Sequence, residues 1–211
     1  PLKEIINCLE SIKSEFRFTI IFGSHPFQLD KQKTTNNAII SIINHKIMYS
    51  PKTITMEGEK ERNNIEPGEN IGVVKLGDIK LGVIICADLW NWKLIYDLVV
   101  KQGAELLVVP AFTVVPKGYR DYAKYQWLSL AITRSREFVV PIVIADHYLN
   151  GQEYDVGAVS CIIDPSIKNE KIKTVEDFVI LPVGELVTYT INFDLIDNYR
   201  NYRSRNGLLQ K

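Results

Sequence analysis

Cys86 is the residue of this 211-residue chain whose surroundings point most clearly to chemistry. It follows an apolar strand predicted over residues 80–85 and precedes a predicted helix, so its side chain sits at a strand-to-helix turn. The N–H groups at the start of a helix favour an anion, so they can stabilise a thiolate or the oxyanion that a thiol attack creates. Taken alone, the same position also suits an ordinary buried core cysteine.

The residues directly after Cys86 complete this turn. Ala87 and Asp88 are expected at the start of the helix, and Asp88 is predicted to cap or orient the turn rather than to transfer protons. Trp90 and Trp92 could line a substrate pocket, although at least one of them is expected to pack the helix.

Five segments together resemble one known family. Residues 82–90 (GVIICADLW) are similar to the nucleophile segment of the nitrilase superfamily, the carbon–nitrogen hydrolases, where an apolar strand leads into Cys-x-Asp and an aromatic-rich turn. Four later segments resemble that family in the same order, and the likeness covers nearly the whole chain. They are residues 103–110 (GAELLVVP), 134–137 (RSRE), 157–165 (GAVSCIIDP) and 188–198.

The resemblance implies a catalytic cysteine, lysine and glutamate. Cys86 is the nucleophile, and Lys52 occupies the lysine position, where its ammonium would stabilise the oxyanion and the thiolate. Counting back from Pro67-Gly68 places the glutamate near the lysine at Glu61. The alternatives are a solvated lysine and a surface glutamate. A pairing of Cys86 with Lys52 predicts a thiol pKa below the value of about 8.5 for a free cysteine.

The family's general-base glutamate lies in a Pro-Glu segment ahead of the region that this chain resembles. Residues 2–16 already resemble the helix that follows that glutamate, and no Pro-Glu pair occurs before Phe18. Three explanations are open: a segment of a longer enzyme, a natural short member with an impaired site, or a chain in which another carboxylate, with Glu61 the best candidate, has taken over. Losing a positioned acid or base typically costs about 10²–10⁴-fold in rate.

Helix-like and strand-like segments alternate along the chain and must position these residues. Helices are predicted over residues 2–16, from Cys86 to Gly103, over 122–136 and over 195–202. Strands are predicted over residues 18–22, 37–44, 46–49, 71–76, 79–86, 106–109, 139–145, 156–164, 178–182 and 187–193, with a surface loop over 53–69. The alternation predicts an α/β architecture with mixed sheets. The resemblance implies a nitrilase-like α-β-β-α sandwich with two mixed sheets between helix layers, shortened at its N-terminus, as a single domain over residues 1–211.

Composition excludes several classes of function. The 25 Lys and Arg balance the 25 Asp and Glu, which argues against a nucleic-acid-binding domain and gives no support for electrostatic membrane attachment. The apolar runs are far shorter than the ~20 residues of a membrane span, and no secretory leader opens the chain, so we expect a cytoplasmic protein. Three scattered cysteines and three isolated histidines predict neither a disulfide framework nor a zinc site.

The resemblance implies a hydrolase that attacks a small non-peptide amide, nitrile or carbamoyl group through a cysteine thioester, without a metal or organic cofactor. Because the general-base glutamate is missing, a non-catalytic nitrilase-like scaffold that binds a ligand or partner is the alternative. A third alternative is the glutaminase part of a larger amidotransferase. We also expect a homodimer or higher homo-oligomer, since residues 199–203 mix aromatic and Arg residues, which are enriched in interfaces.

Overall fold

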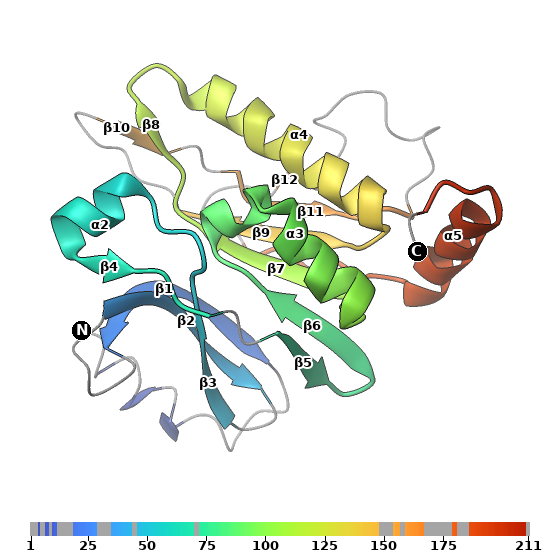
Figure 1. Cartoon of the computed structure of the whole chain (residues 1–211), viewed down its shortest axis with the longest axis horizontal. Helices are drawn as coiled ribbons and strands as arrows, with labels where there is room; N and C mark the ends of the chain where they lie inside the picture. Colours follow the sequence, from blue (N-terminus) through green and yellow to red (C-terminus); the bar gives the residue numbers. More distant parts are fainter. Residues whose placement is uncertain are drawn as a thin grey trace.

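The computed structural model describes residues 4, 7, 8, 10, 11, 19–28, 35–43, 46–69, 72–147, 154–156, 159–166, 179–180 and 186–209. Within these residues the strands form two mixed sheets and a separate two-stranded pair, with helices beside them (Figure 1). The two mixed sheets of the predicted α/β sandwich are therefore confirmed.

The first sheet is built from the amino-terminal part of the chain. Its antiparallel strands are β1 (Ile20–Gln28), β2 (Thr35–Ile43) and β3 (Lys46–Pro51), and β4 (Ile65–Glu66) pairs with β2 in parallel. Strand β1 does not stop at Gly23 as predicted. It continues through a register shift between Phe22 and Ser24, because a glycine in a strand marks a bulge as readily as an end.

The second sheet carries the three parallel strands β6, β7 and β9 at its centre. Its order is β12-β11-β9-β7-β6-β5, with antiparallel pairing at both sides. The strands are β5 (Val73–Leu76), β6 (Ile79–Val83), β7 (Leu106–Ala111), β9 (Ile142–Asp146), β11 (Cys161–Ile163) and β12 (Val179–Ile180), and the separate pair is β8 (Val114–Pro116) with β10 (Tyr154–Val156). Because β6, β7 and β9 are parallel, their carboxyl ends meet at one edge of the sheet.

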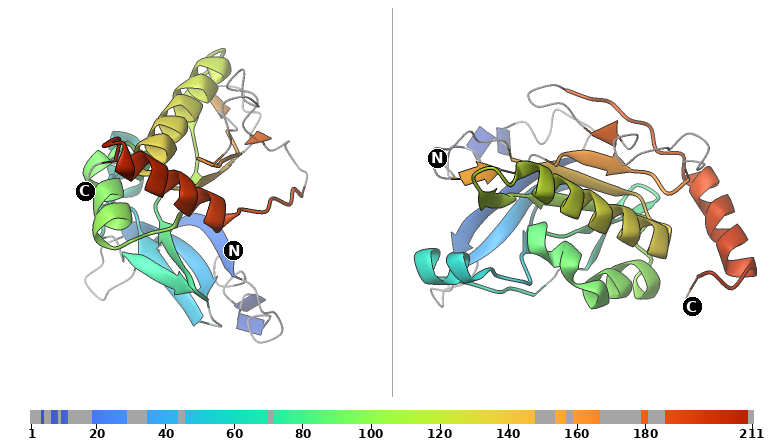
Figure 2. Two further views of the ribbon diagram at one scale, coloured as in Figure 1. Left: turned by 90° about the vertical axis from the view of Figure 1, so that its right-hand side faces the viewer. Right: turned by 90° about the horizontal axis from the view of Figure 1, so that it is seen from above.

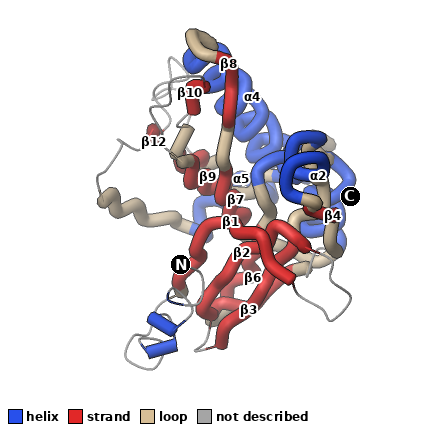
Figure 3. The backbone as a smooth tube through the Cα atoms, turned by 90° about the vertical axis from the view of Figure 1, so that its left-hand side faces the viewer, coloured by secondary structure: helices blue, strands red, loops and turns tan. Residues whose placement is uncertain are grey.

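The two faces of the second sheet are covered differently. Helices α3 and α4 lie on one face, where Leu98, Leu128 and Ile142 are fully buried in the larger core (Figure 1). On the other face a smaller core contains Leu81 and Val83 and is contacted by side chains of β1 and β3, so the two sheets pack on each other (Figure 3). The helices are α2 (Glu57–Asn63), α3 (Trp92–Tyr96), α4 (Arg120–Phe138) and α5 (Phe193–Arg205), with a 3₁₀ turn η1 (Cys86–Trp90) and a π-helical turn η2 (Asp97–Lys101).

Several predicted segments differ from the structure. The predicted strand over residues 156–164 takes in the end of β10 and the whole of β11, which belong to different sheets. Residues 53–69 are not a continuous loop, because α2 and β4 form within them. Residues 187–192 are not a strand, and helix α5 begins directly after them. Of the predicted helix over residues 2–16, the five described residues are helical, and the remainder lies outside the described part of the chain. Among the described helices, none combines the length and the apolar character that crossing a bilayer requires.

Helix α5 is held against the carboxyl end of α4 by its arginines (Figure 2). Arg203 Nη1 donates to the carbonyl oxygen of Arg136 at 2.7 Å, and Arg200 Nη2 donates to that of Val139 at 2.9 Å. The ring of Tyr199 lies 6.0 Å from the guanidinium carbons of both Arg136 and Arg203. These aromatic and Arg residues therefore stabilise a contact within the chain, and the homodimer stays a prediction.

Gly82 on β6 is a position where packing excludes a side chain. A Cβ atom there would lie 2.7 Å from Leu107 Cδ2 and 3.5 Å from Ala104 Cβ. We expect Gly82→Ala to lower the free energy of unfolding by about 1–3 kcal/mol, as overpacked cores do. Gly58, inside α2 with nothing within 4 Å of its ideal Cβ, is the matched control. Gly58→Ala should instead raise stability by about 0.5–1 kcal/mol, and urea unfolding of the two variants checks both signs.

Candidate active site

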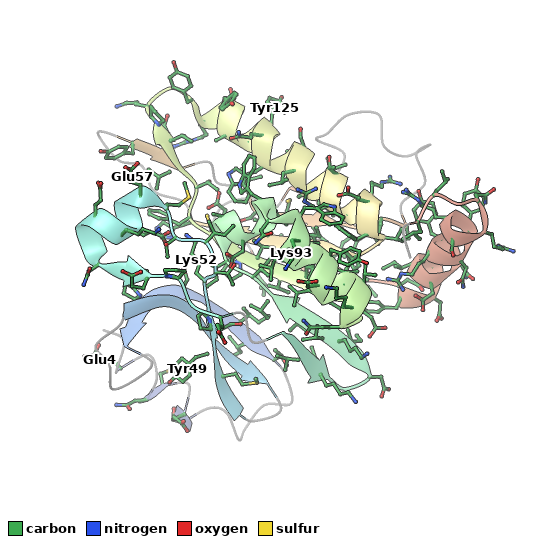
Figure 4. The ribbon with its side chains drawn as sticks, viewed as in Figure 1. Glu4, Tyr49, Lys52, Glu57, Lys93 and Tyr125 are labelled. Carbon is green, nitrogen blue, oxygen red and sulfur yellow. The ribbon has the colours of Figure 1, made fainter. Side chains whose placement is uncertain are left out.

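The candidate site lies at the edge where the parallel strands end. Cys86 follows β6, Phe112 follows β7, and Asp146 is the last residue of β9. Val159 comes just before the antiparallel strand β11 and therefore reaches the same edge. Lys52 arrives from the other sheet, directly after β3 (Figure 4). Five segments far apart in the sequence are thus brought together at one place.

The backbone of Cys86 is strained in a way typical of functional turns. Its φ angle is +46°, in the left-handed region that residues other than glycine rarely adopt. Ile85 and Asp88 close this turn reciprocally: the Asp88 N–H donates to the Ile85 carbonyl at 2.9 Å, and the Ile85 N–H donates to Asp88 Oδ2 at 3.1 Å. Cys86 stays partly exposed, while Ala87 beside it is buried. The turn therefore presents the thiol at the sheet edge.

Lys52 forms a buried ion pair with a glutamate. Its side chain is only 3% exposed, and its Nζ lies 2.5 Å from Glu59 Oε2. Glu59 is the third residue of α2, and the same Oε2 accepts the Met56 N–H at 2.8 Å at the start of that helix. Burying an ammonium without a partner would be costly, so Glu59 is what allows Lys52 to be buried. The solvated-lysine alternative does not describe this residue.

The glutamate that the structure places beside Lys52 is Glu59 and not the predicted Glu61. Glu61 lies two residues further along α2, and its side chain is exposed. The prediction counted positions through residues 53–69 as if they were a loop, whereas a helical turn rotates successive side chains away from each other. A glutamate at the third helical position often accepts the backbone N–H of the residue that caps the helix. That capping residue is usually Ser, Thr, Asp or Asn, so Met56 gives no sequence signal that a helix starts here.

Asp88 connects the Cys86 turn to the loop that carries Lys52. Its side chain is fully buried, and its carboxylate accepts four different donors. Besides the Ile85 N–H, these are the Thr53 N–H at 3.0 Å, the Thr53 hydroxyl at 2.7 Å and the Ile54 N–H at 2.8 Å. The predicted orienting role of Asp88 is consistent with this geometry, which extends well beyond the turn itself. Burial raises the pKa of Asp88, and the hydrogen bonds from Thr53, Ile85 and Ile54 oppose that shift.

Asp146 is a second well-bonded carboxylate that sequence reasoning missed. Its Oδ1 accepts the N–H groups of Thr113 at 3.1 Å and His147 at 2.9 Å. Its Oδ2 accepts the Val159 N–H at 3.0 Å and the Thr113 hydroxyl. Asp146 thus ties the ends of β7 and β9 to the start of β11. Its position as the last residue of a strand parallel to β6 is the signal that could have identified it.

Burial dominates the ionisation of Cys86. Desolvation raises the pKa of the thiol above its ordinary value, and the negative charges of Asp146 and Glu59 raise it further. The Phe112 backbone N–H and the Lys52 ammonium lower the pKa, but they do not outweigh burial. The predicted lowering of the pKa is therefore wrong, because desolvation of the thiol outweighs the positive charge of Lys52, which the charges of Asp146 and Glu59 also oppose.

The aromatic residues near the turn have different surroundings. Trp92 stacks on Tyr96 with ring centroids 5.1 Å apart and also contacts Phe138 on α4, so it packs the helices. Trp90 is 45% exposed, and its ring meets the edge of Trp127. The substrate-pocket role that we predicted for both tryptophans stays a prediction.

Phe112 and His147 are two exposed rings that sequence reasoning did not identify. Phe112 is 50% exposed, His147 is exposed, and their ring centroids lie 5.2 Å apart in an edge-to-face arrangement. The Phe112 backbone lowers the pKa of the Cys86 thiol, which places this residue near the sulfur. The two rings are therefore candidates for the wall of a substrate site.

The raised thiol pKa predicts how Cys86 reacts with iodoacetamide. Because the thiolate is the reactive form, its labelling rate should rise with pH to a midpoint above that of an ordinary exposed cysteine. Glu59→Gln removes a negative charge that raises this pKa, so its midpoint should lie below that of the parent protein. Cys161, whose burial raises its pKa to about 12, should stay unlabelled and serves as the internal control. An unchanged or higher midpoint in Glu59→Gln would contradict this electrostatic account.

Comparison with known proteins agrees with this fold. Residues 3–169 match the family described as carbon-nitrogen hydrolase, so the chain belongs to that family. The fold is similar to that of Saccharomyces cerevisiae Nit3, a member of the nitrilase superfamily, with a TM-score of 0.74 and 20% identity over 93% of this chain and 68% of Nit3. It is also similar to a carbon-nitrogen hydrolase of Helicobacter pylori G27, with a TM-score of 0.77 and 15% identity over 95% and 71% of the two chains.

Two further similar proteins have names that state an activity. The fold resembles an amidase from Nesterenkonia sp. AN1 determined in complex with butyramide, with a TM-score of 0.60 and 16% identity over 75% of this chain and 58% of the amidase. A 31-residue segment is 58% identical to the glutamine-dependent NAD(+) synthetase of Thermotoga maritima. That match covers 15% of this chain and 5% of the synthetase.

Proposed function

We propose that this chain hydrolyses the carbon–nitrogen bond of a small non-peptide amide, nitrile or carbamoyl compound through a thioester on Cys86. The observation that carries the proposal is the buried Lys52–Glu59 pair, whose charges act on a thiol held in a strained turn. A buried lysine beside a cysteine is expensive to maintain for packing alone, and it suits a reaction in which negative charge develops.

In the proposed reaction the Cys86 sulfur attacks the carbonyl carbon and a C–S bond forms. The negative charge moves to the carbonyl oxygen, where the Lys52 ammonium stabilises it. Collapse of this intermediate breaks the C–N bond of an amide or carbamoyl substrate, and water then hydrolyses the thioester. With a nitrile the sulfur would instead form a thioimidate, which one water converts to the same thioester as ammonia leaves. The thiol proton must pass to a general base and on to the leaving nitrogen, because the raised pKa keeps Cys86 protonated at neutral pH. Asp88 and Asp146 suit this role poorly, since each already accepts four hydrogen bonds.

Release of ammonia from a panel of small amides, nitriles and carbamoyl compounds tests this proposal. The Nesterenkonia amidase was determined with butyramide, so short aliphatic amides belong in the panel. We expect at least one compound to be turned over by the folded protein at a rate that saturates with its concentration. A folded protein that releases no ammonia from any member of the panel would contradict the proposal.

A second candidate is the glutaminase part of a larger amidotransferase. The 31-residue identity to the Thermotoga maritima synthetase favours it, because that protein is named as glutamine-dependent. L-glutamine in the same panel distinguishes the two candidates: a glutaminase should release ammonia from glutamine in strong preference to simple amides.

A third candidate is a non-catalytic scaffold that binds a ligand or partner, motivated by Asp88 and Asp146, whose carboxylates are fully occupied by hydrogen bonds and poorly suited to act as the base. Slow alkylation of Cys86 does not favour this candidate, because burial alone already makes the thiol slow at neutral pH. Only turnover of the panel separates the scaffold from the enzyme.

A further inference from the structure

We infer that Asp88 is a positioning residue that sets the placement of Lys52 relative to Cys86. The inference rests on the proposed function in one respect, which is that Lys52 acts on the chemistry at Cys86. It goes beyond that function because it assigns the connection between the Cys86 turn and the Lys52 loop to one buried carboxylate.

Asp88 accepts hydrogen bonds from two segments of the chain. One segment lies 34 and 35 residues before Asp88 in the sequence, and the other lies three residues before it. From the distant segment, Thr53 and Ile54 provide three donors at 2.7–3.0 Å. From the adjacent segment, Ile85 provides its N–H at 3.1 Å. Thr53 directly follows Lys52, and Ile85 directly precedes Cys86. The carboxylate therefore joins the immediate neighbours of both residues.

Asp88 restrains mainly the backbone of the two segments. Three of the four donors are main-chain N–H groups, so the carboxylate restrains the two chains themselves rather than flexible side chains. The side chain of Asp88 is fully buried and belongs to the 3₁₀ turn that begins at Cys86. Movement of the Lys52 loop by even one ångström would break at least one of these bonds, since hydrogen bonds weaken steeply outside their normal geometry.

A role confined to shaping the Cys86 turn does not account for this arrangement. The bond from the Ile85 N–H is sufficient for such a role. The remaining three donors belong to the Lys52 loop, which follows β3 of the other sheet. The number of donors also explains why an ionised carboxylate is needed here. It offers acceptors only, whereas an asparagine would turn its NH₂ group toward one of the N–H donors.

The test measures the electrostatic coupling between Lys52 and Cys86 in two backgrounds. The pH midpoint of Cys86 alkylation is determined by iodoacetamide labelling and peptide mass spectrometry for the parent, Lys52→Met, Asp88→Asn and the double variant. Lys52, Asp146 and Glu59 are the charged groups with the largest influence on the sulfur, and of these three the variants change only Lys52. We expect Lys52→Met to raise the midpoint in the parent background and to produce less than half of that shift in the Asp88→Asn background. An equal shift in both backgrounds would overturn the inference.

Two further variants separate positioning from a general loss of stability. Asp164→Asn is the matched control, because Asp164 is also buried and accepts bonds from Ser166 and Tyr189, which lie in neither loop. It should leave the coupling unchanged, and a loss of coupling there equal to that in Asp88→Asn would overturn the inference. Thr53→Val removes only the hydroxyl donor and should reduce the coupling partially. If Asp88→Asn does not fold, an unchanged coupling in Thr53→Val overturns the inference.

The labelling needs no substrate, so its result is independent of the amide panel. A coupling that depends on Asp88 in a protein without any turnover would contradict the proposed function and support the positioning role. Turnover together with a coupling that does not depend on Asp88 would support the function and overturn the positioning role.

Discussion

Replacing Cys86 with alanine is expected to abolish release of ammonia from every compound that the parent protein turns over. The loss should reach roughly 10⁴-fold or more in kcat, the scale found when a covalent enzyme loses its nucleophile. The physical reason is that alanine cannot form the C–S bond, while the Lys52–Glu59 pair and the hydrogen bonds of Asp88 do not involve the sulfur and stay in place.

Cys8→Ala is the control for this experiment, because Cys8 is an exposed cysteine outside the site. It should retain the parent rate, and both variants should unfold at urea concentrations close to that of the parent protein. Turnover by Cys86→Ala above one per cent of the parent rate would show that another group is the nucleophile, and the proposed reaction would then be wrong.

The second large effect is expected for Lys52→Met, which keeps most of the side-chain stem and removes the charge. Removing one group that stabilises an oxyanion typically lowers kcat by about 10²–10³-fold. The thiol should also become harder to ionise, because the Lys52 charge lowers the pKa of Cys86. The cost to stability should stay below the roughly 3–5 kcal/mol of a fully buried broken pair. Glu59 is 20% exposed and keeps the Met56 N–H.

Lys60→Met is the matched control, since Lys60 is an exposed lysine of α2. Its rate and its alkylation midpoint should equal those of the parent. If Lys52→Met changed stability alone, with kcat and the alkylation midpoint unmoved, Lys52 would be a structural residue and its assignment to the oxyanion would be wrong.

The placement of Cys86 could be predicted from the local pattern of the sequence. Cys86 at the end of an apolar strand, before a helix, is recognisable from a few residues. Glu59 was not found because its position depends on α2, a short helix in a polar segment that lacks a strong start signal. Asp146 and Phe112 follow strands that are distant in sequence from Cys86. Their meeting at one edge depends on the order β9-β7-β6, which no local pattern contains.

The ionisation of Cys86 shows a different limit. The neighbouring charges could be anticipated from the family resemblance, and Lys52 does lower the pKa of the thiol. Desolvation depends on how closely the surrounding elements pack, however, and it outweighs the charge of Lys52. The sign of the pKa shift could therefore be obtained only from the three-dimensional arrangement.

The formation of a thioester on Cys86 is the central claim, and covalent trapping tests it most directly. The protein is mixed with the amide of the panel that it turns over fastest, quenched in acid during turnover, digested and analysed by mass spectrometry. We predict that the peptide containing Cys86 carries the mass of the acyl group and loses it on treatment with hydroxylamine. Turnover with that peptide unmodified, or with the acyl group on another residue, would contradict the account.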